Sequence, residues 1–238
     1  MKGRPARIAA ALSLRAADLV LATSEDTRLG LEAYRLNSVQ TVPLGVDTAL
    51  YQPTFSGRRS YLLTITHLTA DNVSRKRILD VVRAVSAVPG LRAVIVGKKG
   101  NGADAVSDEV ERLGVGDRIV LAGEVSPAEK RRLLSEAAVY VQPTEYEAFG
   151  MAIAEAMACG APVISHAVGN VPALVGDTGL LMSRDAGSEE LCDAIVAVMH
   201  DSRREQRARA ARARIESTFS IDQRREAIRA ALATVCDA

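Results

Sequence analysis

The sequence contains no tryptophan, and aromatic residues of all kinds make up only 3% of its 238 positions. Proteins that hold single-stranded nucleic acid stack its bases on aromatic side chains, so this shortage argues against that function. The formal net charge of +1 agrees, because nothing in the overall charge balance favours a polyanionic partner. We therefore expect no nucleic-acid partner.

Long apolar runs and a pattern of paired cysteines are also missing. No run approaches the roughly 18 apolar residues that a membrane-spanning helix needs, and the N-terminal run 8–14 is short for a secretory signal. Cys159, Cys192 and Cys236 are an odd number of cysteines without metal-ligand spacing. We interpret the first two as small core residues of a protein in the reducing cytoplasm, with export as the alternative.

The body of the chain alternates short apolar runs with amphipathic segments. The runs are rich in Val, Ile and Leu without strict alternation, as in strands buried on both faces. They span 61–66, 91–97, 118–122, 138–142, 161–165 and 179–182, and helical patterns cover 76–88, 103–113, 126–136 and 149–158. This βαβ series predicts an α/β fold with a doubly wound parallel sheet.

Polar or glycine-rich loops follow the predicted strands. They lie at 66–76, 97–102, 123–125, 143–147 and 166–170. Parallel strands end at the same edge of a sheet, and open α/β folds bind their ligands at this carboxyl edge. The sequence therefore predicts a ligand site at that edge.

Two glutamates, Glu147 and Glu155, belong to the most informative of these segments. Between Phe149 and Cys159 the only charged side chain is Glu155. A carboxylate on such an apolar helix is costly unless it is hydrogen-bonded. In a helix over 149–158 the two carboxylates would lie about 12 Å apart along the axis. Flanking a helix N-terminus, which attracts phosphate, such a pair can hold both ends of a sugar–diphosphate–nucleoside.

The two ends of the chain lie outside the βαβ series. Residues 1–50 hold two helical stretches, the apolar runs 18–22 and 39–43, and a turn-rich connector. The stretch 187–238 is helical, with an arginine cluster at Arg203, Arg204, Arg207, Arg209, Arg212 and Arg214. We interpret this cluster as a solvated helix face. The alternative is a peripheral contact with anionic lipid at the inner face of the membrane.

These segments together resemble the C-terminal half of the retaining glycosyltransferases of family 4, whose GT-B architecture has paired Rossmann-like domains. The motifs are Ala17–Val20 with Ser24, Val42–Asp47, Leu134–Pro143, the Glu-x7-Glu signature from Glu147 to Glu155, Ala156–Val163 and Thr178–Leu181. They occur in the family's order, and the resemblance covers the chain from about residue 16 to its end. It implies a remnant of the N-terminal acceptor domain at 1–48, a Rossmann-like nucleotide-sugar-binding domain at 49–218 and a C-terminal helix at 219–238.

By motif, the resemblance assigns catalytic roles to Glu147, Lys76 and Arg75. Glu147 would orient the donor sugar through its hydroxyls. Lys76 and Arg75 would neutralise the charge that develops on the leaving diphosphate. Family members typically need no bound metal, which agrees with the absence of an Asp-x-Asp motif in this sequence. The resemblance thus implies a nucleoside-diphosphate sugar as donor, with no metal and no cofactor.

The resemblance also assigns positions that bind the donor. Glu155 would accept both ribose hydroxyls, because a carboxylate offers two acceptor oxygens. The other positions are the backbone amides near Phe149, Gly150 and Met151 for the diphosphate, the loops at Gly97 and Val125 for the base, and His67 beside the site.

The chain departs from the family pattern at three points. His67 follows the strand where the family places a Gly-Arg pair, and Pro172-Ala173 stands in place of Pro-Glu. These departures weaken the phosphate-binding inference and remove one supporting carboxylate. Family members also carry a large acceptor-binding domain, and this chain would contain only its end.

The implied function is transfer of a hexose from a nucleoside diphosphate to an acceptor hydroxyl with retained anomeric configuration. One alternative is a non-catalytic module that binds the nucleotide sugar. Another is a subunit whose acceptor half is a separate polypeptide, which predicts an apolar patch at the edges formed by 1–35 and 220–238. A sugar-nucleotide epimerase of the same architecture is a third.

Overall fold

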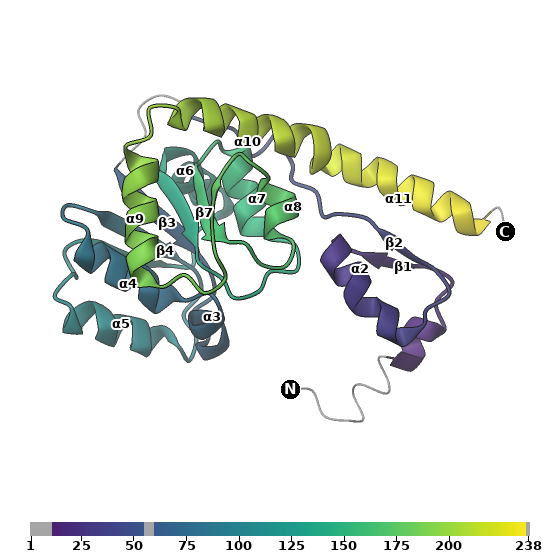
Figure 1. Cartoon of the computed structure of the whole chain (residues 1–238), viewed down its shortest axis with the longest axis horizontal. Coiled ribbons are helices and arrows are strands. Elements are labelled where there is room, and N and C mark those ends of the chain that lie inside the picture. The colour runs from purple at the N-terminus through teal and green to yellow at the C-terminus, as the bar shows by residue number, and fades with distance from the viewer. Residues whose placement is uncertain (1–10, 55–59, 237–238) are drawn as a thin grey trace.

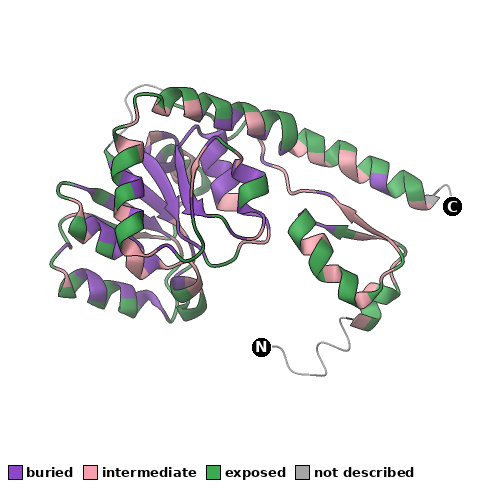
Figure 2. Cartoon of the chain, in the orientation of Figure 1, coloured by how far each residue is buried: buried purple, intermediate pink, exposed green. Residues whose placement is uncertain are grey.

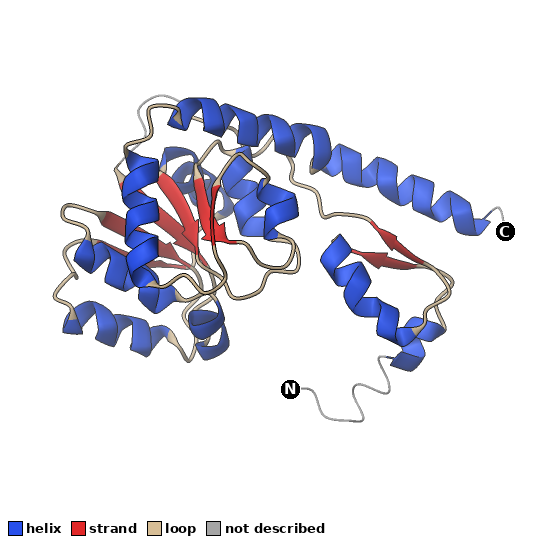
Figure 3. Cartoon of the chain, in the orientation of Figure 1, coloured by secondary structure: helices blue, strands red, loops and turns tan. Residues whose placement is uncertain are grey.

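A six-stranded parallel sheet with helices on both faces forms the main body of the computed structural model (Figures 1 and 3). The structure describes residues 11–54 and 60–236, apart from the side chain of residue 236. The strands are β3 (Tyr61–Ile65), β4 (Arg92–Val96), β5 (Ile119–Gly123), β6 (Val139–Gln142), β7 (Val163–His166) and β8 (Leu180–Met182). Their order is β5-β4-β3-β6-β7-β8, and all pairs are parallel. The doubly wound α/β fold predicted from the sequence is confirmed, with its topological switch between β3 and β6.

Two apolar clusters cover the opposite faces of the sheet. One face packs against α4 (Ile78–Ala87), α5 (Ala103–Arg112) and α9 (Ser188–Met199), and the other against α6 (Pro127–Glu136), α7 (Met151–Ala158), α8 (Val171–Val175) and α10 (Arg204–Thr218). Successive strand residues point to opposite faces, so Leu62 joins the first cluster and Leu63 the second. Burial on both faces explains the continuous apolar runs (Figure 2).

The cysteines follow the sequence interpretation in part. Cys159 is buried, as expected for a small core residue. Cys192 is only half-buried, and it packs against the first cluster.

The stretch 66–76, expected to be a polar loop, contains the helix α3 (Ala70–Arg75). Thr69 caps this helix by accepting a hydrogen bond from the backbone N–H of Asn72 at 3.3 Å. The helix is short and polar, so it has no apolar periodicity for a sequence pattern to detect. The predicted helix at 76–88 begins only at Ile78, because Arg77 adopts a left-handed conformation, with φ of 48°.

A small separate βαβ unit precedes the main sheet. Helical residues 11–15 are followed by β1 (Val20–Ala22), α2 (Glu25–Leu31), the 3-10 helix η1 (Glu32–Tyr34) and β2 (Val39–Thr41). β1 and β2 form a parallel pair. Part of the first predicted helix falls on residues 1–10, outside the described residues. The predicted domain limits at 48 and 218 stay a prediction.

The C-terminal helix α11 (Ile221–Cys236) runs from the main body back to the small unit (Figure 1). Arg224 Nη1 donates to the carbonyl of Pro43 at 2.7 Å, and Gln40 Nε2 donates to Thr234 Oγ1 at 3.0 Å. The first and last parts of the chain are therefore joined by direct contacts. None of the helices in the described part of the chain has the length and apolarity to span a membrane.

The arginine cluster does not form one solvated helix face. Arg212 is only 9% exposed and donates to the carbonyls of Thr48, Tyr51 and Ala158. Arg214 donates to the carbonyls of Ala173 and Leu174, while Arg207 and Arg209 form ion pairs with Asp201 and Glu205. The solvated-face interpretation is therefore wrong for Arg212. Carbonyls at a helix end and in a connector have no intrahelical N–H to bond to, and the Arg212 guanidinium provides N–H donors for them.

Candidate functional site

A cleft of about 540 Å³ lies at the carboxyl edge of the sheet, where the sequence predicts the site. Its walls come from the segments after β3, β4 and β6, from the start of α7, and from α6. Thr23 of the small N-terminal unit and Leu44 of the connector complete the lining. The cleft also receives Lys76, Glu147 and Glu155. The structure thus gathers residues separated by about half of the chain into one concave site.

The helix α7 begins at the floor of this cleft. Its N-cap is Gly150, with φ of 97°, and within the described part of the chain no side chain caps the helix. A Cβ atom on Gly150 would lie 3.0 Å from Leu174 Cδ2 and 3.4 Å from Glu147 Cγ. Glycine therefore gives both the left-handed conformation and the space. The uncapped first-turn amides, beginning near Met151, form a site suited to an anion.

Phe149 contributes to the cleft through its backbone only. Its ring is 3% exposed and meets Phe219 edge to face, with centroids 6.0 Å apart. Its carbonyl accepts a hydrogen bond from Asn170 Nδ2 at 3.0 Å. The packed ring and this hydrogen bond fix the chain just before α7.

Glu147 lies beside Lys76 in the cleft. Lys76 Nζ is 3.6 Å from Glu147 Oε2, and Gln142 Nε2 donates to the same oxygen at 2.8 Å. Burial lowers the pKa of Lys76, and the neighbouring Glu147 carboxylate partly opposes this effect. An anionic ligand at this position would favour the charged form of the lysine.

The guanidinium of Arg75 lines the cleft but is committed to neighbouring groups. Nη1 donates to the carbonyl of Tyr146 and Nη2 to Asn72 Oδ1, both at 2.9 Å. The Arg75 carbonyl in turn accepts from the backbone N–H of Glu145 at 2.8 Å. These contacts tie α3 to the loop that carries Glu147. Any contact of Arg75 with a phosphate stays a prediction.

Glu155 is 7% exposed, and both of its oxygens face partners. Tyr51 Oη donates to Oε1 at 2.7 Å. Lys130 Nζ lies 2.5 Å from Oε2 in an ion pair. Burial, with the Glu155 carboxylate beside it, raises the pKa of Tyr51. The costly carboxylate recognised in the sequence is thus partly satisfied by the protein itself.

The remaining predicted residues divide into two groups. Gly97 and His67 line the cleft, and a Cβ on Gly97 would lie 1.8 Å from the carbonyl of Thr66, so only glycine fits this floor between β3 and β4. Val125, predicted to frame the base, is not among the lining residues. It packs against the core cluster beneath α7 instead, because its apolar side chain is better buried than exposed to the cleft.

Three residues of the site were missed by the sequence analysis: Tyr51, Lys130 and Gln142. Lys130 belongs to α6, Tyr51 to the connector and Gln142 to the end of β6. Their contacts with the two glutamates arise only from the fold, although Gln142 belongs to the motif Leu134–Pro143. Lys130, four residues after the start of the helix predicted at 126–136, is the nearest local signal.

Two further observations concern the rest of the described chain. Within residues 11–54 and 60–236, no group of three or more His, Cys, Asp or Glu side chains is placed to hold a metal ion. A second hollow, of about 280 Å³, lies at the opposite edge of the sheet beside β8, α9 and α10. It holds none of the predicted site residues.

Comparison with known proteins places these features in a family. The model of the family described as "Glycosyl transferases group 1" matches residues 61–215. A D-inositol 3-phosphate glycosyltransferase of Mycobacteroides abscessus is 36% identical over 121 residues, which are 48% of this chain and 27% of that protein. An MMP alpha-(1->4)-mannosyltransferase of Mycolicibacterium hassiacum is 30% identical over 172 residues, covering 71% of this chain and 41% of that protein. The chain therefore spans less than half the length of these relatives.

Solved structures share the fold over almost the whole chain. Sucrose-phosphate synthase from Thermosynechococcus elongatus matches 100% of this chain and 63% of its own, with a TM-score of 0.87 and 23% identity. HepE from Anabaena, in complex with UDP and glucose, matches 96% of this chain and 66% of its own, with a TM-score of 0.85 and 22% identity. At such identities the likeness shows the fold alone.

Proposed function

The chain belongs to the glycosyl transferases of group 1, and on that premise we propose that its cleft binds a nucleoside-diphosphate sugar. One observation carries the proposal: Glu147 and Glu155 line the same cleft, on either side of the uncapped start of α7. The diphosphate would lie at this helix N-terminus. Glu155 would then hold the ribose, and Glu147 the hydroxyls of the sugar.

We further propose that the intact protein is a retaining hexosyltransferase of the family 4 type. The bond between the anomeric carbon and the diphosphate would break, and a bond to the acceptor oxygen would form on the same face of the sugar. The departing diphosphate oxygen takes the electron pair of the broken bond as negative charge, and it accepts the proton that the acceptor hydroxyl loses. Lys76 and Arg75 line the cleft and would stabilise that charge, so the proposal requires neither metal nor cofactor.

The acceptor side of the reaction calls for a second structural unit. Because the chain spans less than half of its curated relatives, we propose that an acceptor domain, joined or separate, completes the cleft. The exposed apolar side chains Leu12, Leu21, Leu29 and Leu232 lie at the edges where a separate partner was predicted to bind. A two-stranded sheet such as β1–β2 is marginally stable alone, which also favours such a partner.

A product assay separates the catalytic function from the binding-module alternative. The chain is incubated with donor and candidate acceptors, with and without a separately supplied N-terminal domain of a relative. Turnover by the chain alone would eliminate the module. Binding without turnover under both conditions would favour it.

Calorimetry tests the donor site itself. UDP, GDP, ADP and their common sugar conjugates are titrated into the chain and into Glu155→Ala. We expect one nucleotide series to bind, with affinity lost in the variant. UDP is the first choice, because HepE was crystallised with it. Binding by no nucleotide, or equal binding by the variant, would contradict the proposal.

The cytoplasmic location and the membrane contact stay predictions. The membrane contact was predicted from the arginine cluster. Its support is weaker because Arg212 and Arg214 donate to backbone carbonyls of the protein. Cosedimentation of the chain with vesicles of phosphatidylglycerol tests it directly. No binding at low salt would remove it.

A further inference from the structure

A short chain of buried polar groups lies beneath the cleft at the end of β6. Tyr140 and Gln142 are 0% and 1% exposed and, two residues apart on a strand, point to the same face. Tyr140 Oη donates to Gln142 Oε1 at 2.7 Å. Gln142 Nε2 then donates to Glu147 Oε2 at 2.8 Å. This series of hydrogen bonds thus runs from the interior of the protein to the carboxylate proposed to bind the sugar.

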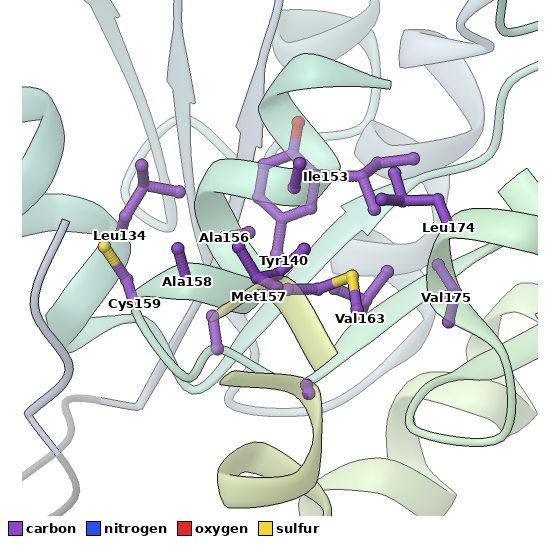
Figure 4. Packing of buried hydrophobic residues seen from close by; sticks show 14 of the residues in the cluster. Leu134, Tyr140, Ile153, Ala156, Met157, Ala158, Cys159, Val163, Leu174 and Val175 are labelled. Atoms are coloured by element: carbon purple, nitrogen blue, oxygen red, sulfur yellow. The ribbon is translucent and has the colours of Figure 1, made fainter. Parts of the chain in front are cut away.

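The surroundings of Tyr140 are apolar. Figure 4 shows this side chain among those of Ile153, Met157 and Leu174. In such a place a buried amide, like that of Gln142, destabilises the fold unless its groups are hydrogen-bonded. Both ends of the Gln142 amide are bonded, one of them to a residue of the cleft. The polar side chain therefore needs an explanation beyond packing.

The orientation of the Gln142 amide follows from the carboxylate beside it. A carboxylate only accepts hydrogen bonds, so the amide nitrogen faces Glu147 and donates to it. The amide oxygen then faces Tyr140, whose hydroxyl donates to it. Complete burial raises the pKa of this hydroxyl well above its usual range, so it keeps the proton that it donates.

The contacts of the Glu147 carboxylate are all on one side. Gln142 and Lys76 both approach Oε2, and within the described part of the chain no hydrogen bond or ion pair falls on Oε1. Two contacts on one oxygen fix the rotation of the carboxylate. Oε1 is then the oxygen with both lone pairs available to a ligand.

We propose that Gln142 is a positioning residue that holds Glu147 so that Oε1 is presented to the hydroxyls of the donor sugar, with Tyr140 anchoring the oxygen of its amide. The proposal rests on the proposed function of the cleft. It extends that function by naming residues that act on sugar binding without touching the sugar. Orientation of this kind contributes because a fixed carboxylate loses less entropy on binding the ligand.

The test compares two dissociation constants for each variant by calorimetry. The first is for the nucleoside diphosphate and the second is for its sugar conjugate. The first divided by the second measures the contribution of the sugar, and this ratio falls when binding of the sugar weakens. Gln142→Met keeps the size of the side chain and removes the donor. Gln142→Glu keeps the shape, replaces the donor with an acceptor and adds a like charge beside Glu147. Tyr140→Phe removes the group that anchors the amide oxygen.

We expect the ratio to fall about tenfold in Gln142→Met and further in Gln142→Glu, since a hydrogen bond to a charged group is lost. Tyr140→Phe should lower it about threefold, because the amide is still present but less firmly anchored. Affinity for the nucleoside diphosphate itself should not change. Glu147→Gln gives the reference for loss of the sugar carboxylate.

Ser165→Ala is the matched control for a purely structural role. Ser165 is equally buried and its hydroxyl donates to the backbone carbonyl of Gln142 at 2.7 Å, without reaching Glu147. This variant should lose stability and keep the wild-type ratio.

The outcomes separate the positioning role from the function of the cleft. An unchanged ratio in Gln142→Met, with a lowered ratio in Glu147→Gln, would overturn the positioning role and leave the proposed function intact. If the wild-type chain bound the nucleoside diphosphate and its sugar conjugate with equal affinity, Glu147 would not bind the sugar. The positioning role of Gln142 would then be contradicted as well. Failure to bind any nucleotide would instead contradict the proposed function.

Discussion

At the scale of single residues, the site depends on charged groups that the fold buries next to one another. Lys76 shows the consequence most clearly, because its side chain is only 14% exposed and burial lowers its pKa. A bound diphosphate would raise that pKa again, since it favours the charged form of the lysine. Binding and protonation are therefore linked.

The linkage has a definite sign. Affinity for the nucleoside diphosphate should be highest below the pKa of free Lys76, and should fall as the pH rises through it toward the ordinary lysine value of about 10.4. Calorimetry between about pH 7.5 and 10 keeps the diphosphate fully ionised and tests this. Lys76→Arg, which stays charged, should show no such fall. A wild-type affinity that is constant or rises over this range would contradict the role of Lys76.

The hydrogen bond from Tyr51 to Glu155 can be measured against an internal control. Tyr51→Phe removes the donor from a carboxylate that is 7% exposed, so the free energy of unfolding should fall by about 1–2 kcal/mol. Tyr146, which is 46% exposed, donates to Asp26 at 3.2 Å. Tyr146→Phe should change the same quantity by less than about 0.5 kcal/mol. Equal effects in urea denaturation would show that Glu155 does not need Tyr51.

At the scale of secondary-structure elements, the start of α7 decides whether the cleft can hold an anion. Gly150→Ala strains a left-handed residue and brings a Cβ within 3.0 Å of Leu174. The first-turn amides should move, and affinity for the nucleoside diphosphate should fall about tenfold in calorimetry.

Gly114 is the matched control for this substitution. It also has a positive φ, of 64°, but a Cβ there would meet no described atom within 4 Å, and it lies at the end of α5 away from the cleft. Gly114→Ala should cost about 1 kcal/mol of stability and leave nucleotide affinity unchanged. Equal affinities of the two variants would mean that the start of α7 does not bind the diphosphate.

The elements also show how far sequence reasoning reaches. Strands buried on both faces are short, continuous apolar runs, so the sheet and its carboxyl-edge loops were predictable. The helix α3 was not predictable, because its short sequence has no apolar periodicity. It is held instead by the Thr69 cap and by the hydrogen bond from Arg75. Glu155 could be identified because a carboxylate in an apolar helix is costly. Tyr51 and Gln142 could not, since tyrosine and glutamine are unremarkable until the fold places them against the two glutamates.

At the scale of the whole molecule, one arginine joins three separate parts of the chain. Arg212 of α10 donates to Thr48 and Tyr51 in the connector and to Ala158 at the end of α7. It therefore supports the element that carries Glu155 and the segment that carries Tyr51. Its removal leaves three carbonyls without this donor.

Arg212→Met should lower the free energy of unfolding by about 3 kcal/mol in chemical denaturation. The control is Arg209→Met on the same helix, where the arginine forms an exposed ion pair with Glu205 and the free energy should be nearly unchanged. A loss in Arg212→Met no larger than in the control would show that α10 is not anchored in this way.

The central claim is that one ligand spans the cleft, with its nucleoside at Glu155 and its sugar at Glu147. The most direct test is a crystal structure of the chain with the nucleoside-diphosphate sugar that calorimetry identifies. We predict the ribose hydroxyls at Glu155, the diphosphate at the start of α7 beside Lys76, and the sugar hydroxyls at Glu147 Oε1. A ligand bound in the reverse direction, or in the hollow beside β8 and α10, would contradict this account.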